Sequence, residues 1–337
     1  MTVAVVRFDE TLDSICHAIE LCGGFDKLNR HSQILIKPNI LFSGWMPIPL
    51  YGMVTSARVV EGVLYMLAEY GCSNIYIGEG GISGVLGSRT TVGYRRTGIQ
   101  EVANKYGVQT VDLNEGPFER ISIGGEKIGV ANLVLESDFL INIPVLKTHS
   151  QVKVSLGLKN LKGCIDYDSR KVFHKKGLEH MIVLLNEIIS CDLTIIDGIY
   201  MLEKGPDTLL GLAHRKNVII ASQDTFSCDC VGATIMGIDP AQVGYLKEYA
   251  EAYNRSTDIN SMVILGENLA FLNESIDWIS SVDDDLLGPA GITGLSVPHP
   301  GQGLCSSCYA NLVFSLAVIA HDNHDSHVPV TTIHCGS

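Results

Sequence analysis

The sequence predicts an α/β protein with one or more mostly parallel sheets flanked by helices. Short apolar, β-branched runs recur along the chain, and segments with apolar residues at helical spacing lie between them. Strands that alternate with helices in this way form parallel sheets with helical crossovers. We expect an α/β domain over residues 1–272, as one body or as two lobes meeting near 138–176. A C-terminal segment over 273–337 follows, with a Gly/Pro-rich lid or linker that leads to a helix.

Local signals define each expected element. The first helix ends at Gly23-Gly24, and Thr55-Ser56 caps a helix with one apolar face. The run Phe139–Ile143 is short and apolar, and we expect Pro144 to end its ladder because proline lacks an N–H. The expected strands are 2–7, 33–37, 74–77, 110–113, 139–143, 193–196, 217–221 and 262–265, with a hairpin at 118–130. The expected helices are 10–21, 55–70, those up to about 106, 178–189, 228–236 and one from residue 240.

The composition is that of a globular chain, with 46% hydrophobic and 18% charged residues. The sequence contains no run of about 20 apolar residues, so it predicts no transmembrane helix. The N-terminus enters a strand at once, without the pattern of a signal peptide. We therefore expect a cytoplasmic protein that does not contact membranes. The net charge of −13 disfavours nucleic-acid binding, which needs a broad positive surface.

A basic stretch, residues 147–176, stands out from this acidic background. It holds eight Lys/Arg against two acids, a net charge of +6 that leaves −19 for the rest of the chain. It follows a buried strand, and such strand ends often carry ligand sites in α/β proteins. We expect Lys159, Asn160 and Lys162 to bind a small anion, and Lys147 or His149 to move a proton. The alternative is a solvated basic loop.

The glycine-rich run Gly78–Gly87 follows a strand and precedes a helix, where backbone N–H groups can bind phosphate. It lacks the GxxxxGK[ST] pattern, and its glycines do not fit GxGxxG. Gly80 and Gly81 are candidate ligand-binding positions. A tight turn without a ligand accounts for the pattern equally well, and the Glu79 charge would oppose a polyanion.

The pair Cys305-Ser306-Ser307-Cys308 opens an apolar helix, where the helix dipole and free N–H groups stabilise thiolates. With a third cysteine the pair could hold a [4Fe–4S] cluster that keeps one iron open to substrate. Cys164 is the favoured third ligand, because it directly follows the lysines. The same pair could instead be a redox dithiol or two packed thiols. The alternative third ligands are Cys228, Cys230 and Cys335.

Two further groups of polar residues could have either a structural or a functional role. Asp197 and Asp229 lie near strand ends and helix starts, where they are candidate catalytic carboxylates or helix caps. The histidines and aspartates of the sequence HDNHDSH, from His321 to His327, fit no zincin spacing, so we interpret them as a polar loop.

Several motifs, in order, resemble the bacterial and archaeal family catalogued as domain of unknown function 362. They are KPN at 37–39, IGEGG at 77–81, DFLINIPVLKTH at 138–149, LGLKNLKG at 156–163, IIDGI at 195–199 and D-x₄-D-x₃-A-x₂-MGIDP at 224–240. The match covers about residues 30–250 and adds Lys37 and Asn39 to the candidate substrate-binding residues. The resemblance implies an α/β domain, and many members carry ferredoxin-like cysteine modules. This chain lacks such a C-x₂-C-x₂-C-x₃-C-P module.

The favoured hypothesis is an iron–sulfur enzyme, a lyase or an oxidoreductase, that acts on a small carboxylate-bearing substrate bound by residues 147–176. The cluster would act as Lewis acid or one-electron donor. One alternative is a non-catalytic anion- or nucleotide-binding protein with structural thiols, and another is a dithiol oxidoreductase. Assembly as a homodimer is a further expectation.

Overall fold

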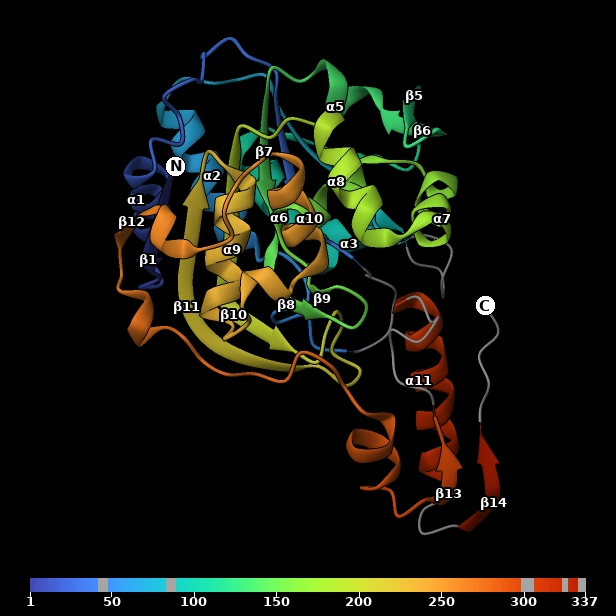
Figure 1. Ribbon diagram of the computed structural model, residues 1–337. Helices are drawn as coiled ribbons and strands as arrows, with labels where there is room; N and C mark the ends of the chain where they lie inside the picture. The colour runs from blue at the N-terminus through green and yellow to red at the C-terminus, as the bar shows by residue number, and fades with distance from the viewer. Residues whose placement is uncertain (42–47, 83–88, 298–305, 323–326, 333–337) are drawn as a thin grey trace.

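The computed structural model describes residues 1–41, 48–82, 89–297, 306–322 and 327–332. Within these residues ten strands form one sheet, with the order β12-β1-β11-β10-β7-β2-β3-β4 and with β8 and β9 attached beside β10 (Figure 1). The strands of this sheet are β1 Thr2–Arg7, β2 Ile34–Pro38, β3 Ile75–Glu79, β4 Gln109–Asp112, β7 Phe139–Ile143, β8 Val145–His149, β9 Lys153–Val154, β10 Leu193–Glu203, β11 Leu212–Ser222 and β12 Val263–Gly266. The hairpin is β5 Phe118–Ile123 and β6 Glu126–Ala131.

Helices cover both faces of the sheet (Figure 1). They are α1 Asp13–Leu21, α2 Ala57–Glu69, α3 Thr90–Arg96, α4 Ile99–Tyr106, α5 Asn132–Glu136, α6 Gly157–Asn160, α7 Tyr167–Lys176, α8 Leu178–Ile188, α9 Thr225–Ile235 and α10 Gly244–Ala252. The pairing of β2 with β3 and β7, of β3 with β4, and of β7 with β10 is parallel. The predicted α/β class with a mostly parallel sheet is therefore confirmed.

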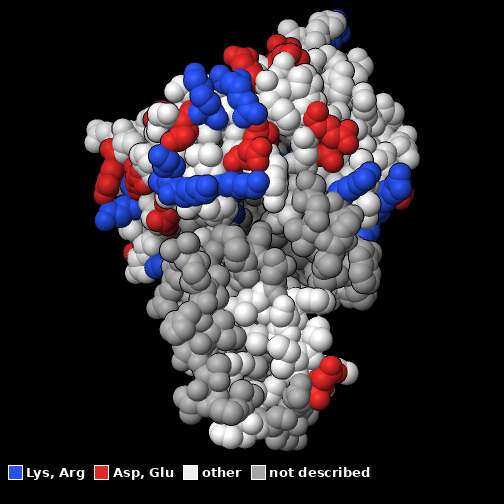
Figure 2. Space-filling view, turned by 90° about the vertical axis from the view of Figure 1, so that its right-hand side faces the viewer, with Lys and Arg blue, Asp and Glu red and all other residues white. Residues whose placement is uncertain are grey.

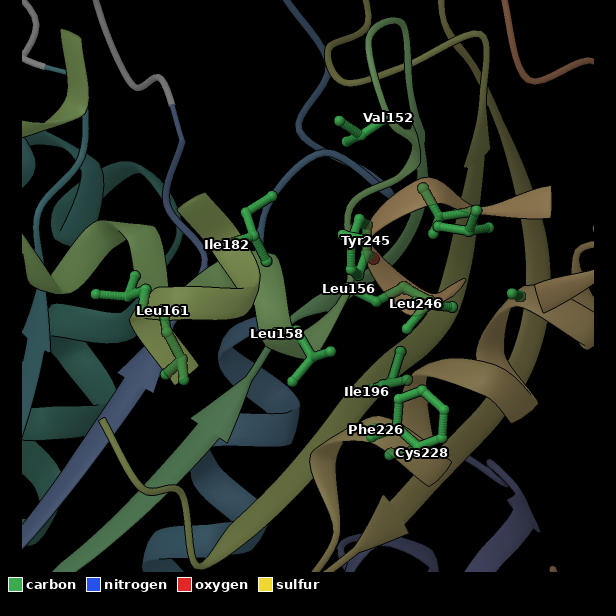
Figure 3. Close-up of a cluster of buried hydrophobic side chains, with 14 of the residues drawn as sticks. Val152, Leu156, Leu158, Leu161, Ile182, Ile196, Phe226, Cys228, Tyr245 and Leu246 are labelled. Atoms are coloured by element: carbon green, nitrogen blue, oxygen red, sulfur yellow. The ribbon is translucent and has the colours of Figure 1, made fainter. Parts of the chain in front are cut away.

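The alternation of side chains along each strand separates two hydrophobic cores. In β2, Ile34 and Ile36 pack in the core beneath α1, α2 and α4, whereas Leu35 packs in the opposite core. That opposite core lies beneath α8, α9 and α10, and its centre includes Leu156, Phe226 and Leu246 (Figure 3). Because both faces of the sheet are buried, its strands are continuously apolar, which is what made them recognisable in the sequence.

Several strand boundaries differ from the prediction, two of them next to Pro144 and Gly198. Pro144 does not end the ladder, because its carbonyl accepts a hydrogen bond from Asp197 N at 2.8 Å and the chain resumes pairing with β10 as strand β8. The expectation that residues 193–196 end at Asp197-Gly198 is also wrong, since β10 continues to Glu203. Gly198 allows this, because a Cβ there would lie 2.6 Å from the Val218 side chain at a register shift against antiparallel β11.

Strand order places a topological switch point next to the basic stretch. From β2 the chain proceeds to β3 and β4 on one side, and then returns to β7 and β10 on the other side. The switch point therefore lies between β2 and β7, and in open α/β sheets the carboxyl ends of strands at such a point are the usual ligand site. Lys37 and Asn142 occupy these ends, and they stand side by side in the β2–β7 register.

The C-terminal segment forms a separate small core next to one end of the α/β part (Figure 1). It contains β13 Thr293–Ser296, β14 His327–Thr332 and α11 Ser306–Asp322, which begins at the end nearer the α/β part. Leu209 and Leu210 of the α/β part pack against this core. The division of the chain at residue 272 stays a prediction. No helix in the described ranges is long and apolar enough to cross a bilayer.

The start of α9 provides a test of what stabilises the fold. Asp224 accepts a hydrogen bond from Ser227 N at 3.0 Å and pairs with both terminal nitrogens of Arg255, at 2.8 and 2.5 Å. We expect Asp224→Ala to lower the free energy of unfolding by about 2 to 4 kcal/mol, because a helix cap and a charged pair are lost together. Urea unfolding measures this.

Asp258→Ala is the matched control, since Asp258 caps only a short, exposed 3₁₀ turn. Asp224→Asn can keep the cap and should fall between the wild type and Asp224→Ala. Equal losses in the Asp224→Ala and Asp258→Ala variants would contradict the role given to the Arg255 pair.

Candidate anion-binding site

A buried ion pair joins the carboxyl ends of β2 and β3. The Lys37 Nζ atom lies 2.7 Å from Glu79 Oε2 and 3.0 Å from the carbonyl oxygen of Pro38. Both side chains are almost completely buried. The pair is covered by Gly163, where a Cβ would lie 2.2 Å from Glu79 Oε1 and 2.7 Å from Lys37 Nζ. Only glycine fits there without displacing the pair.

Next to this pair, three asparagine side chains form a buried hydrogen-bond chain. Asn39 Nδ2 donates to Asn160 Oδ1 at 3.0 Å, and Asn160 Nδ2 donates to Asn142 Oδ1 at 2.8 Å. Lys147 joins the chain by donating to Asn39 Oδ1 at 2.7 Å, and it also donates to the carbonyl of Met53 at 2.6 Å. The candidates Lys37, Asn39, Lys147 and Asn160, which come from distant parts of the sequence, therefore meet at the switch point.

Two lysines of this cluster lack a bonded carboxylate among the described residues. Lys147 donates to neutral oxygens, and Lys159 donates to Ser155 Oγ at 3.2 Å. Burial, followed by the charge of Lys159, lowers the pKa of Lys147 to about 7, against an opposing effect of Asp207. Lys159 is half-buried, and this burial, followed by the charge of Lys37, lowers its pKa to about 7 as well. We call Lys37, Lys147 and Lys159 the lysine cluster.

Both histidines of the basic stretch are neutral imidazoles at physiological pH. Burial holds the pKa of His149 well below its ordinary value, and the charges of Lys159 and Lys162 add to the effect. His149 Nδ1 accepts a hydrogen bond from Gln151 N at 3.1 Å. Burial and the charge of Lys162 hold the pKa of His174 at about 3. The Lys162 Nζ and His174 Nε2 atoms lie 2.8 Å apart.

Two exposed lysines of the basic stretch have acidic partners. Lys171 Nζ lies 3.0 Å from Asp168, and Lys176 Nζ lies 2.7 Å from Glu126. On the face of the molecule drawn in Figure 2, Lys and Arg side chains (blue) lie among Asp and Glu side chains (red) over the α/β part. Lys171 and Lys176 are thus neutralised at the surface, whereas Lys147 and Lys159 of the lysine cluster have no such carboxylate partner among the described residues.

The Asp197 carboxylate lies at the start of α2, outside the asparagine chain. It accepts hydrogen bonds from Ser56 N at 2.7 Å and Ile199 N at 3.1 Å, and burial raises its pKa above the ordinary value. Asp229 has a similar position before α6, where it accepts from Gly157 N at 2.6 Å and Leu158 N at 2.9 Å. Asp197 thus binds one N–H group at the start of α2, and Asp229 binds two at the start of α6. A catalytic role for Asp197 stays a prediction.

The glycine turn after β3 is occupied by protein groups. Gly81 N donates to Thr90 Oγ1 at 3.2 Å, and the Gly81 carbonyl accepts from Arg170 Nη1 at 3.2 Å. A Cβ at Gly80 would lie 2.2 Å from Arg170 Nη2, so glycine is needed for this close packing. Residues 83–88 lie outside the described residues. A ligand-binding role for Gly80 and Gly81 stays a prediction.

The predicted cluster ligands are only partly within the described residues. Cys305 lies outside them, and the position of the Cys308 side chain on α11 is not described. Cys164 is fully buried, and burial raises the pKa of its thiol to about 12. Cys228 and Cys230 are buried in the core on α9, and Cys335 lies outside the described part. No three His, Cys, Asp or Glu side chains of the described part are arranged to hold a metal ion. The [4Fe–4S] cluster therefore stays a prediction.

Several residues of the site are not recognised as such from the sequence. Asn142 is a lone polar residue in an apolar strand, which is a usable signal because a buried amide needs partners. Glu79 was recognised, but as a charge that would oppose an anion, whereas it is neutralised by Lys37. Arg170 and Asp207 reach the site through tertiary packing, and no spacing in the sequence indicates it.

Comparisons with known proteins identify a family and a relative of this chain. The family model described as Domain of unknown function (DUF362) matches residues 34–234. The thylakoid-associated protein sll1697 of Synechocystis sp. is 26% identical over 239 residues, which cover 69% of this chain and 72% of that protein. A cytoplasmic location and a homodimer stay predictions for this chain.

A structural likeness is more distant. The lactate racemase apoprotein of Thermoanaerobacterium thermosaccharolyticum aligns with a TM-score of 0.46 and 12% sequence identity, over 68% of this chain. This chain spans 56% of that protein's length. At this distance the likeness carries no inference about activity.

The depressed pKa of Lys159 has a consequence for stability. The folded-state pKa of about 7 lies below the ordinary value of 10.5, so the unfolded chain binds more protons between these values and stability rises with pH across this window. We expect Lys159→Met to raise the free energy of unfolding by about 1 to 3 kcal/mol at pH 6. The gain should shrink between about pH 7 and pH 10.5. Urea unfolding at pH 6, 8 and 10 measures it.

Lys171→Met is the control, since Lys171 is exposed and paired with Asp168 in the same stretch. It should leave stability unchanged within about 0.5 kcal/mol at each pH. A Lys159→Met variant that is less stable than wild type at pH 6 would show that the amino group is well compensated.

Proposed function

We propose that this chain, which belongs to the family described as Domain of unknown function (DUF362), binds a small carboxylate-bearing anion at the lysine cluster and moves a proton on it. The observation that carries the proposal is the unmatched positive charge at the strand ends. Lys37 has a carboxylate partner, whereas the described part of the chain gives Lys147 and Lys159 only neutral hydrogen-bond acceptors.

A bound carboxylate would offset the cost of burying these amino groups. Removing an ammonium group from water costs several kcal/mol of solvation free energy, and a nearby opposite charge can offset this cost. The ligand would therefore raise the pKa of Lys147 and Lys159 and bind together with a proton. A small acid suits the site better than a polyanion, because the Gly81 N–H of the glycine turn is already bonded to Thr90.

The two lysines suit different roles. Lys147 is held by Asn39 and Met53, so its amino group is fixed in position to bind the carboxylate. Lys159 has one hydrogen bond, of 3.2 Å, and a pKa of about 7, so it can accept or donate a proton near neutral pH. His149 has too low a pKa to act as an acid at neutral pH. We therefore assign the proton transfer to Lys159.

The iron–sulfur part of the proposal places Cys305, Cys308 and Cys164 around one [4Fe–4S] cluster, for a lyase or an oxidoreductase reaction. Its support is the position of α11. Tyr309 lies in the first turn of α11. Burial raises the pKa of Tyr309, and the charge of Asp207 also raises it. The Asp207 carboxylate also interacts electrostatically with Lys147. The pKa of Cys164 is affected by Lys37 and Glu79. A thiol with so high a pKa would need the metal itself to hold it as thiolate. Such a cluster supplies Lewis-acid or one-electron chemistry.

Calorimetric titration with malonate tests the anion site. We expect saturable binding at pH 8 accompanied by proton uptake, seen as a binding enthalpy that differs between buffers of different ionisation enthalpy. Lys147→Met should weaken binding at least about tenfold, because a charged hydrogen bond contributes about 1.5 to 3 kcal/mol. Lys171→Met should bind as the wild type does. Binding without proton uptake, or equal binding by the Lys147→Met variant, would contradict the proposal.

Anaerobic purification tests the cluster. We expect brown protein with stoichiometric iron and sulfide, and loss of both in Cys305→Ser, Cys308→Ser and Cys164→Ser variants. Cys16→Ser is the control, because Cys16 lies on α1 against the Gly62 carbonyl. Colourless protein that cannot be reconstituted with iron and sulfide would remove the cluster from the proposal and leave the anion site to be judged by calorimetry.

A further inference from the structure

A cavity lies beside the lysine cluster. A cavity of about 730 Å³ opens at the same edge of the sheet, on the side of α2. It is lined by the end of β1, by residues from Pro49 to Arg58, by the end of α3 and by parts of β8, β10 and β11. Its volume lies within the range typical of pockets for small organic ligands.

The wall between the two sites is the segment from Gly52 to Val54. Gly52 and Val54 line the cavity, whereas the carbonyl of Met53 faces the other way and binds Lys147 Nζ. Among the described residues, none of the three amino groups of the lysine cluster lines this cavity. A ligand here would therefore be recognised by groups other than those that bind the carboxylate.

One part of the cavity presents aromatic rings. The centroids of the Tyr51 and Tyr200 rings lie 4.8 Å apart, with an interplanar angle of 37°. Tyr51 is 62% exposed, which is unusual for so large a ring and leaves a face for a planar ligand. Stacking of a nucleobase on an aromatic side chain contributes about 1 to 3 kcal/mol and is tolerant of which base it is.

Another part of the cavity presents guanidinium groups. Arg58, Arg96 and Arg215 line it, together with the carboxylates of Glu10 and Asp197. Glu10 is paired with Arg215, and Asp197 accepts two backbone N–H groups, so both acids are compensated. Each guanidinium carries five N–H donors in a planar fork that fits phosphate. In the described residues Arg58 bonds Glu61 and the Glu10 carbonyl, and Arg215 bonds Asn217 and Glu10, which leaves donors on both.

We infer that this cavity binds a mononucleotide, with its base against Tyr51 and Tyr200 and its phosphate at Arg58 and Arg215. A simple inorganic anion would use neither the aromatic pair nor most of the volume. A purely apolar ligand would make no use of the remaining donors of Arg58 and Arg215. A nucleotide combines the flat ring and the anionic group that the two parts of the cavity accept.

Calorimetric titration with AMP, adenosine and inorganic phosphate tests this inference on the full chain. We expect AMP to bind more tightly than either adenosine or phosphate. Tyr51→Ala should weaken AMP about tenfold through lost stacking. Arg215→Gln should weaken AMP at least about fivefold and leave adenosine unchanged. Tyr65→Ala is the matched control, because Tyr65 is an exposed tyrosine of α2 that does not line the cavity.

A further variant separates this inference from the proposed function. Lys159→Met should reduce the proton uptake on malonate binding to the part that Lys147 contributes. It should keep the affinity for AMP, because Lys159 does not line the cavity. Three results would each overturn the inference: no saturable binding of AMP, equal affinity for AMP and adenosine, or AMP affinity unchanged in both Tyr51→Ala and Arg215→Gln.

Discussion

The burial of lysine amino groups at the carboxyl ends of the strands is the constraint on which the rest of the site depends. One of these charges, on Lys37, is matched by Glu79 at 2.7 Å, and Gly163 leaves the space in which the two side chains meet. The amino groups of Lys147 and Lys159 are not matched by a carboxylate within hydrogen-bond distance in the described residues. A buried ammonium without a counter-charge tends to lose its proton near neutral pH. Charge, more than shape, therefore identifies this site.

The topology of the sheet explains how residues from distant parts of the sequence reach this place. The reversal of strand order between β2 and β7 places Lys37 and Asn142 at the carboxyl ends of adjacent strands, and the short strand β8 brings Lys147 to the same edge. The segment before α2 crosses this edge. It binds Lys147 through the Met53 carbonyl and separates the lysine cluster from the cavity lined by Tyr51 and Tyr200. The fold thus supports two chemically different surfaces at one edge of the sheet.

The sequence predicted the fold class well because both faces of the sheet are buried, so that runs such as Phe139–Ile143 are apolar apart from Asn142. It also pointed to Lys147 and Asn160 through the basic stretch after a buried strand, and the family resemblance added Lys37 and Asn39 through the KPN motif. It failed where tertiary contacts decide the outcome. Pro144 does not end the sheet, because its carbonyl still accepts a hydrogen bond from the neighbouring strand. Nothing local indicates that Arg170 packs against the glycine turn, or that Tyr51 and Tyr200 meet from distant parts of the chain.

The central claim is that the lysine cluster holds unmatched positive charge that a carboxylate neutralises. NMR titration of ¹³Cε-labelled lysines measures this most directly, with Lys147→Met and Lys159→Met variants to assign the two signals. Without ligand, the account expects both amino groups to titrate near pH 7. With saturating malonate, both should titrate close to their ordinary value of 10.5. Titration of both groups near 10.5 in the absence of any anion would contradict the account.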